Sequence, residues 1–262
     1  MSLLTNSLLL VLREILEAAI LLGLLWNYTN FRELSMRWLW WAAPISLVLS
    51  LLYAKNLADL TELWDGSGQE LISASLHVLV YLPVLMLLAG LYGGLSKPAA
   101  EKIMAVVLIA AAVREGSEIL IYLGAFTQLD AQRNTVLLGA FIGAGIGISA
   151  GILVSALIHN MNRNVATPFV GGMLACVAAG MMMQGVSLLD QVGLVPYSSM
   201  AYSTEWLIEE QSILGQLLYA VFGYDSEPTW LQISLYVVCI FTAFALLLHS
   251  HKIRGMRNEI AN

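Results

Sequence analysis

The chain contains 262 residues, of which 59% are hydrophobic and only 11% are charged, and its mean hydropathy is +0.77. Charged residues make up about a quarter of a soluble domain, so this composition excludes a soluble protein and predicts an integral membrane protein. The formal net charge of −6 at pH 7 is informative mainly through its distribution along the chain. Cys176 and Cys239 both fall inside apolar runs, and we interpret them as small packing residues.

Seven apolar runs are long enough to cross a bilayer as helices, since a span needs about 20 predominantly apolar residues. They cover residues 4–26, 38–55, 71–95, 103–126, 135–158, 168–189 and 230–250. The first run has no basic segment before it and is not expected to be a cleavable signal peptide. We therefore predict an all-α membrane protein with seven transmembrane helices in a single domain over residues 1–262.

The first and fourth runs each carry charged residues near their centres. The pattern Arg-Glu-x-x-Glu occurs in both, as Arg13, Glu14 and Glu17 and as Arg114, Glu115 and Glu118. Each charge costs about 2.5–3.5 kcal/mol at the centre of an inserted helix, so its presence there indicates a function.

The spacing of the motif places its three charges on one side of a helix, because successive residues are about 100° apart. Lipid cannot satisfy such a side, so it must face protein or water. Two matching sides predict that the first and fourth helices face each other.

The order of the runs also predicts internal symmetry. Runs one to three form repeat one (about residues 1–95), and runs four to six form repeat two (about 100–190). Because each repeat has an odd number of spans, the second repeat begins on the opposite side of the membrane and has the inverted orientation. This is the 3+3 inverted repeat of many secondary transporters, with the site at the midplane. The helix over residues 230–250 is additional. In the fifth run, Gly143, Gly147 and Gly151 predict a surface for close helix packing.

Basic residues lie almost entirely in alternate connections and in the C-terminal tail. One set of connections and the tail hold Arg32, Arg37, Lys97, Lys102, Arg163, Lys252, Arg254 and Arg257, whereas the opposite set holds only Lys55 and Arg133. The positive-inside rule then puts the N-terminus outside and the C-terminus in the cytoplasm. The expected location is the cell (inner or plasma) membrane.

The connection over residues 190–229 is expected outside and contains no Lys or Arg. Its acidic residues are Asp190, Glu205, Glu209, Glu210, Asp225 and Glu227. Such a surface would concentrate cations and steer them inward, although an ordinary solvated loop has the same composition. Within it, residues 213–222 are apolar but too short to span, and predict an interfacial or re-entrant helix.

Four glutamates with two arginines leave a formal charge of −2 in a medium of low dielectric constant. A purely structural ion-pair network should be neutral, so protons or a bound cation must remove the excess. Carboxylate oxygens suit hard cations such as Fe³⁺, Mn²⁺, Mg²⁺ or Ca²⁺, with Fe²⁺ borderline. The charge alone does not choose between Fe²⁺ and Fe³⁺.

Paired Arg-Glu-x-x-Glu motifs in the first and fourth of seven spans resemble those of the oxidase-dependent iron permeases, the iron/lead transporter family. The resemblance runs nearly end to end. Residues 66–70 (Gly-Ser-Gly-Gln-Glu) are similar to the family's Gly-x-Gly-Gln-Glu segment, and residues 215–228 to its Gly-Tyr…Pro-Ser stretch, with Thr229 in place of the Ser. Two departures are Ile15, where Gly is usual, and Ser73, where many members are acidic.

The resemblance implies a permease that moves iron (Fe³⁺ or Fe²⁺) into the cytoplasm as its substrate, without a bound cofactor and without enzymatic activity. It gives the metal-handling positions to Glu14, Glu17, Glu115 and Glu118, and the motif arginines are Arg13 and Arg114. No ferroxidase sequence is present, so an extracytoplasmic iron-binding protein or ferroxidase is the expected partner, beside membrane lipid. No nucleic-acid partner is expected.

A path by which cations enter is expected to involve residues on the outer side of the bundle. Candidates are Glu70, His77, Asp190, Glu205, Glu209 and Glu210, with Gln184 towards the same end of its run. A packed histidine is the competing interpretation for His77. The methionines at 181–183 point different ways around a helix and are interpreted as packing.

Other functions stay open at this stage. The chain could be a permease for another cation (Pb²⁺, Mn²⁺), or a membrane enzyme with a carboxylate-bridged metal centre. Such enzymes usually need Glu-x-x-His, which does not occur here. A metal sensor would need a signalling segment, which the twelve residues after Ser250 are not expected to supply.

Overall fold

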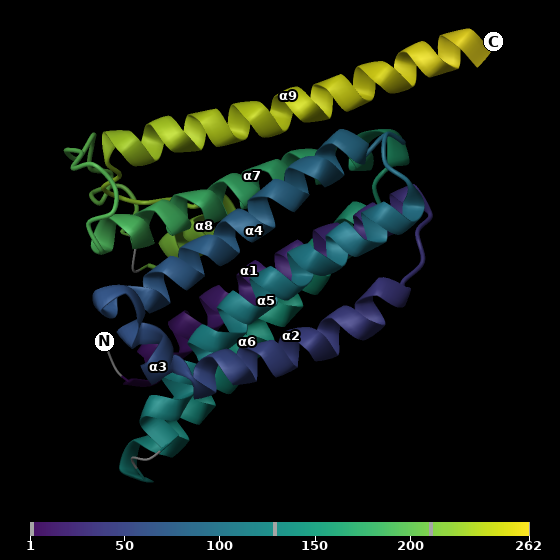
Figure 1. Ribbon diagram of the computed structural model, residues 1–262. Coiled ribbons are helices and arrows are strands. Elements are labelled where there is room, and N and C mark those ends of the chain that lie inside the picture. The colour runs from purple at the N-terminus through teal and green to yellow at the C-terminus, as the bar shows by residue number, and fades with distance from the viewer. Residues whose placement is uncertain (1–2, 128–129, 210–211, 262) are drawn as a thin grey trace.

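The computed structural model describes residues 3–127, 130–209 and 212–261, and over these residues the fold is all-helical (Figure 1). The helices are α1 (Leu3–Arg32), α2 (Arg37–Lys55), α3 (Leu57–Glu62), the 3-10 helix η1 (Leu63–Gly66), α4 (Gly68–Gly90), α5 (Lys97–Thr127), α6 (Asp130–His159), α7 (Arg163–Gln191), α8 (Ile213–Phe222) and α9 (Trp230–Ala261). An isolated antiparallel bridge joins Met200 to Thr229 in the described part of the connection before α9.

Five described helices are long and apolar enough to cross a membrane. They are Arg37–Lys55, Gly68–Gly90, Gln132–His159, Arg163–Gln191 and Trp230–Lys252. The first and fourth predicted spans form α1 and α5, which have 30 and 31 residues. They are long enough to cross a membrane, but each of them carries a charged motif. The chain is therefore a multi-pass membrane protein, and the count of seven spans stays a prediction.

The long helices lie side by side in one bundle. α1 packs along α6, α2 along α5 and α4 along α7, while α1 also contacts α5. α9 covers α7 and α4 at one edge of the bundle, and α2 lies at the opposite edge (Figure 1). This arrangement encloses α1 and α5, the two motif helices, between the other elements.

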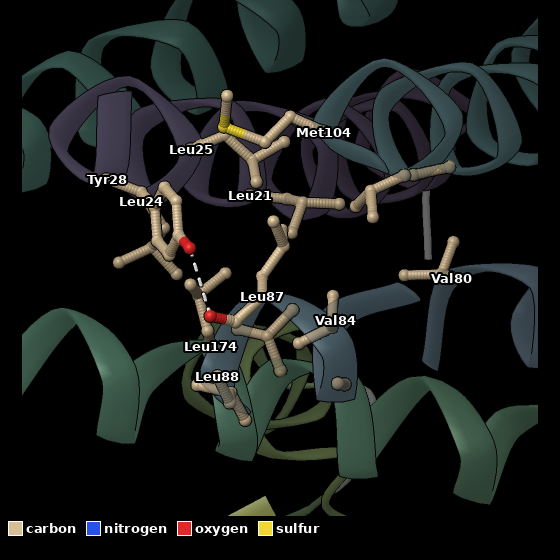
Figure 2. Close-up of a cluster of buried hydrophobic side chains, with 14 of the residues drawn as sticks. Leu21, Leu24, Leu25, Tyr28, Val80, Val84, Leu87, Leu88, Met104 and Leu174 are labelled. Atoms are coloured by element: carbon tan, nitrogen blue, oxygen red, sulfur yellow. Dashed lines mark hydrogen bonds between the residues drawn. The ribbon is translucent and has the colours of Figure 1, made fainter. Parts of the chain in front are cut away.

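The core fills the space between α1, α4, α5 and α7 with aliphatic side chains. Leu21, Leu24, Val84 and Leu87 are almost fully buried there, and Figure 2 shows how they interdigitate.

Outward-facing residues on the peripheral helices are also large and apolar. Examples are Trp40 on α2, Phe141 and Ile152 on α6, and Phe241 and Leu248 on α9. An apolar exterior of this extent is suited to lipid contact.

The glycine stripe of α6 lies against α1, as predicted. A Cβ atom at Gly143 would come 2.4 Å from the carbonyl oxygen of Leu8, and one at Gly151 would come 2.5 Å from the Cβ of Ala19. Only a residue without a side chain allows the backbones to approach this closely. The stripe therefore serves helix packing.

The short apolar segment forms α8 over the predicted residues, and it packs against α1 and α7. Its C-cap, Gly223, has a φ of +65° and lies so close to Gly180, midway along α7, that a Cβ at 223 would be 2.5 Å from the Cα of Gly180. Tyr219 lies beneath Arg13, midway along α1. The end of α8 thus lies beside the charged motif of α1 and the middle of α7.

Three connections meet at one end of the bundle, which we call the basic end. Arg32 at the end of α1 donates to the Leu95 carbonyl oxygen in the α4–α5 turn (2.6 Å), and Arg163 at the start of α7 donates to the carbonyl oxygen of Phe31. The hydroxyl of Ser250 on α9 accepts from the backbone N–H of Tyr92 (3.3 Å). Connections predicted to share one side of the membrane therefore share one end of the molecule.

Candidate functional site

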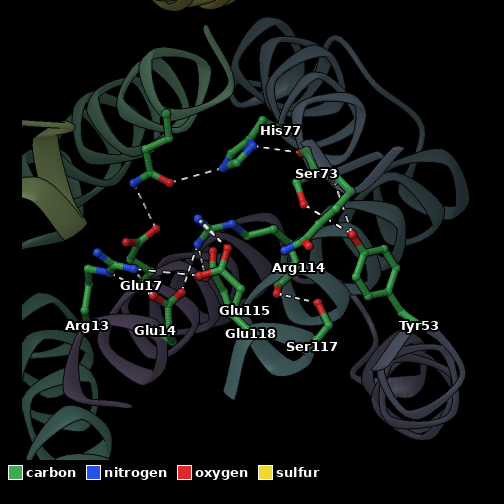
Figure 3. A network of polar contacts seen from close by, with 12 residues as sticks. Arg13, Glu14, Glu17, Tyr53, Ser73, His77, Arg114, Glu115, Ser117 and Glu118 are labelled. Carbon is green, nitrogen blue, oxygen red and sulfur yellow. Dashed lines mark hydrogen bonds and ion pairs between the residues drawn. The ribbon is translucent and has the colours of Figure 1, made fainter. Parts of the chain in front are cut away.

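The two Arg-Glu-x-x-Glu motifs contact each other across α1 and α5 (Figure 3). Nη1 of Arg114 lies 2.9 Å from Oε2 of Glu14, and Nη2 of Arg13 lies 3.7 Å from Oε2 of Glu118. Each arginine therefore pairs with a glutamate of the other motif. The prediction that the two helices face each other is confirmed.

Arg114 is the centre of this cluster. Besides Glu14, its guanidinium pairs with Glu115 and with Oε1 of Glu118, 3.0 Å away. The residue is only 5% exposed. A guanidinium has five N–H donors in a rigid plane and stays charged, so one buried arginine can hold three carboxylates at once.

Arg13 is less buried and has fewer partners. Its Nη2 lies 2.6 Å from Oε1 of Glu14, and its guanidinium carbon is 5.2 Å from the ring centroid of Tyr219 on α8. The face of an aromatic ring attracts a cation. α8 therefore closes over the motif of α1 and contributes a contact that the motif itself does not reveal.

Glu17 differs from the other three glutamates. Within the described residues no arginine pairs with it, and its Oε2 accepts from Nε2 of Gln184 on α7 at 3.2 Å. Oε1 of Gln184 lies 3.1 Å from Nε2 of His77 on α4, whose Nδ1 lies 2.9 Å from the carbonyl oxygen of Ser73. A buried chain of hydrogen bonds thus runs from Glu17 to His77 and joins α1, α7 and α4.

Several polar atoms of the cluster have no partner. Oε1 of Glu17, Oε1 of Glu115 and Nε of Arg114 are shielded from water and make no hydrogen bond to the residues that the structure describes. A buried carboxylate oxygen without a partner is costly. With a formal charge of −2 over four glutamates and two arginines, the two oxygens are suited to a hard cation.

The carboxylates are not arranged as a metal cage. Over the described ranges, no three His, Cys, Asp or Glu side chains converge so that they could hold a metal ion. The physical reason is that Arg114 lies between the glutamates and occupies their oxygens. A cation that binds here must displace some of these arginine contacts.

The structure places the other candidate residues at different distances from the cluster. His77 is buried and connected to Glu17 through Gln184. Glu70 is half-buried at the first turn of α4, and its shielded Oε2 has no partner among the residues described. Asp190, Glu205 and Glu209 are exposed in or near the connection before α8, and Glu210 lies outside the described residues. Asp190, Glu205 and Glu209 form no ion pair with Arg13 or Arg114 in the described part of the chain.

Sequence reasoning did not single out Tyr219, whose ring contacts Arg13. The two residues are far apart in the chain, and no local spacing links them. The nearest signal was the short apolar segment that forms α8. Gln184 was expected to line an entrance, whereas it contacts Glu17 directly.

Ionisable side chains enclosed by apolar helices are typical of membrane proteins that move ions or substrates, relay protons or hold a charged ligand. The model of the iron permease FTR1 family matches residues 70–252. The chain belongs to this family. The match includes the motif on α5.

Three relatives match over most of their length and most of this chain. The ferrous iron permease EfeU of Yersinia pestis is 27% identical over 91% of this chain and 91% of its own. The protein of the same name from Yersinia pseudotuberculosis is 27% identical over 91% of this chain and 90% of its own. An uncharacterised protein of Archaeoglobus fulgidus is 24% identical over 92% and 94% of the two chains. No solved structure matches the chain.

Proposed function

We propose that this iron permease moves iron ions inward across the cell (inner or plasma) membrane through one mid-membrane site, formed by Glu14, Glu17, Glu115 and Glu118. The observation that carries the proposal is the contact of Arg114 with Glu14 across the two motif helices. That contact brings the two motifs together, while Oε1 of Glu17 and Oε1 of Glu115 stay without partners in the described structure. Each motif alone offers two carboxylates, too few to replace the water of a hard cation.

Fe²⁺ is the ion that we propose for this site. Its charge neutralises the formal −2 of the cluster, whereas Fe³⁺ would leave an excess. The relatives from Yersinia carry the name ferrous iron permease, which supports the same oxidation state. Fe³⁺, Mn²⁺ and Pb²⁺ are the competing substrates.

Exchange of arginine for cation is the step that the geometry supports. In the absence of metal, Arg114 satisfies oxygens of Glu14, Glu115 and Glu118. An arriving cation takes over part of these oxygens, and the guanidinium shifts towards the remaining ones. The arginines then hold the neighbouring carboxylates in place and repel a second cation.

The proposed topology has seven spans, with α1, α2 and α4 as one repeat and α5, α6 and α7 as the inverted second. In this scheme α1 is equivalent to α5, and α2 is equivalent to α6. The packing of α1 on α6 therefore has its counterpart in the packing of α5 on α2, and both contacts are present. The basic end is placed in the cytoplasm. Cysteine-accessibility labelling should place residue 252 inside and residue 209 outside. Labelling of both from the same side would contradict this topology.

An extracytoplasmic iron-binding protein or ferroxidase is the proposed partner, delivering iron to the acidic connection before α9. Glu205 and Glu209 are exposed there. Neutralising both, together with Glu210, should lower uptake mainly at limiting iron and at low ionic strength, because exposed charges act through steering. Unchanged uptake under those conditions would leave the connection as a solvated loop.

The direct test is uptake of radioactive iron into proteoliposomes that contain the purified chain, with Fe²⁺ kept reduced and Fe³⁺ kept chelated in separate assays. The proposal predicts uptake of Fe²⁺ that Glu14→Gln or Glu115→Gln abolishes. Glu101→Gln, at the basic end of α5, is the control and should leave uptake unchanged. Faster uptake of Fe³⁺ than of Fe²⁺ would contradict the assigned oxidation state.

A further inference from the structure

The basic end contains a polar cavity of about 390 Å³ that the iron site does not use. The end of α1, the turn between α4 and α5, and the start of α7 form its walls. Its polar lining residues are Arg32, Glu33, Tyr92, Lys97, Arg163 and Thr167. We call it the basic pocket.

Three cations and one carboxylate line the basic pocket, so its formal charge is +2. Backbone carbonyls hold the cations in place: Arg32 donates to Leu95 O (2.6 Å), Lys97 to Glu33 O (3.0 Å) and Arg163 to Phe31 O. A neutral carbonyl fixes a side chain without cancelling its charge. The one carboxylate, on Glu33, lies 3.8 Å from Nη1 of Arg163, and both side chains are more than half exposed. Such a pair compensates little charge.

Arg32 also keeps an unused donor. Its Nε is shielded from water and has no hydrogen-bond acceptor among the residues that the structure describes. The guanidinium plane presents several parallel N–H groups, which match the oxygens of a phosphate. The net positive charge of the cavity is suited to an anionic acceptor that comes from outside the chain.

The level of the pocket in the bilayer identifies the source of that acceptor. Arg32 follows the exposed Trp26 by six residues, which is about 9 Å along a helix. Trp40 and Trp41, exposed at the start of α2, lie at the same end of the bundle. Exposed tryptophans mark the interface of the membrane, so the pocket lies at the level of the headgroups.

We infer that the basic pocket binds the phosphate group of an anionic phospholipid. Basic pockets between helices at the cytoplasmic side are suited to such headgroups. The pocket joins the end of α1 to the starts of α5 and α7, and Tyr92 in its wall contacts the ring of His251 on α9 at 5.0 Å between centroids. A bound headgroup therefore links three helices, including both motif helices, and stabilises the bundle against thermal unfolding.

The test uses the full chain purified into phosphatidylcholine nanodiscs, titrated with phosphatidylglycerol in one series and with inorganic phosphate in another. The readouts are the melting temperature and the number of retained phosphatidylglycerol molecules by native mass spectrometry. Phosphatidylglycerol is expected to raise the melting temperature of the wild type in a saturable way. Inorganic phosphate at the same headgroup concentration is expected to have little effect, since it is not concentrated at the membrane surface.

Variants separate the pocket from general surface charge. Lys97→Gln and Arg163→Gln should each weaken the effect of phosphatidylglycerol about fivefold, the contribution of one cation near a membrane surface. Arg163→Lys keeps the charge and should retain most of the effect. Arg133→Gln, which removes one exposed charge from α6 away from the basic end, is the matched control and should behave as the wild type.

The inference is overturned if Lys97→Gln responds to phosphatidylglycerol as the wild type does. It is also overturned if inorganic phosphate reproduces the full effect, since the site would then bind a free anion. Lys97 is exposed, so its substitution is compatible with folding and keeps the test decisive even if Arg163→Gln does not fold. The readouts involve no iron, so this result is independent of the proposed transport.

Discussion

Arg114 on α5 and Glu14 on α1 form a buried ion pair, with Nη1 and Oε2 2.9 Å apart. The two residues belong to different motifs and lie 100 residues apart in the chain. A single pair of this kind is a weak indication of stability, because desolvation offsets much of the attraction. The Arg114–Glu14 pair also joins two motifs that together contain four glutamates and only two arginines.

Arg114→Gln should destabilise the bundle strongly in the absence of metal. Removing one partner of a buried ion pair typically costs about 3–5 kcal/mol, and Arg114 has three carboxylate partners. Added Fe²⁺ should restore part of the melting temperature, because a cation replaces the lost charge. Thermal unfolding in detergent, with and without Fe²⁺ under reducing conditions, measures both effects.

Arg13→Gln is the matched comparison for this measurement. Arg13 is only partly buried, so its loss should lower the melting temperature less than the loss of Arg114. A larger effect for Arg13→Gln, or no recovery of Arg114→Gln with metal, would contradict the central position of Arg114.

Gln184→Leu should reduce iron uptake about tenfold at low iron concentration while the protein still folds. The substitution removes the donor to Oε2 of Glu17, and an unsatisfied buried acceptor costs about 1–3 kcal/mol. His77→Ala should have a smaller effect, because His77 acts on Glu17 only through Gln184. Gln132→Leu, at an exposed position on α6, is the control, and equal losses in the two glutamine variants would contradict a specific role.

Gly223→Ala should disturb the seating of α8 and lower both stability and uptake. The added Cβ would lie 2.5 Å from the Cα of Gly180, at a φ of +65°. Gly193→Ala is a matched control, because Gly193 has a φ of +68° but no atom within 4 Å of the added Cβ. Backbone strain alone costs about 1–2 kcal/mol, and both variants should show it. Gly223→Ala should therefore lower the melting temperature more than Gly193→Ala does. Equal losses in the two variants would show that α8 does not depend on the contact with Gly180.

Much of the fold follows from local patterns in the sequence. The repeated motif indicated that α1 and α5 face each other, because charges that cannot face lipid must face one another. The apolar segment of ten residues gave the limits of α8, and the glycine spacing indicated a packing surface. These are properties of one helix at a time, or of two helices with the same motif.

Contacts between unlike segments could not be predicted in this way. Nothing in the spacing of Arg13 shows that Tyr219 covers it, and nothing near Glu17 shows that Gln184 donates to it. The short helix α3 and the turn of η1 were not predicted. In η1, Trp64 and Asp65 adopt left-handed backbone angles, with φ of 51° and 60°, which are uncommon for residues other than glycine. The helices α1, α5 and α9 extend beyond the predicted apolar runs, since apolarity ends before the helices do.

The central claim is that four glutamates of two repeats form one iron site, although their surroundings differ. Glu17 is fully buried beside Gln184, whereas Glu118 is partly exposed and pairs with both arginines. If the four act as a unit, substitutions at the two positions should have the same effect and should not be additive.

The most direct measurement is initial Fe²⁺ uptake into proteoliposomes by Glu17→Gln, Glu118→Gln and the double variant, each normalised to inserted protein. Either single substitution should nearly abolish uptake, and uptake by the double variant should be scarcely lower. Full uptake by Glu17→Gln, with loss only in Glu118→Gln, would mean that the motif on α1 is structural and that no shared site exists.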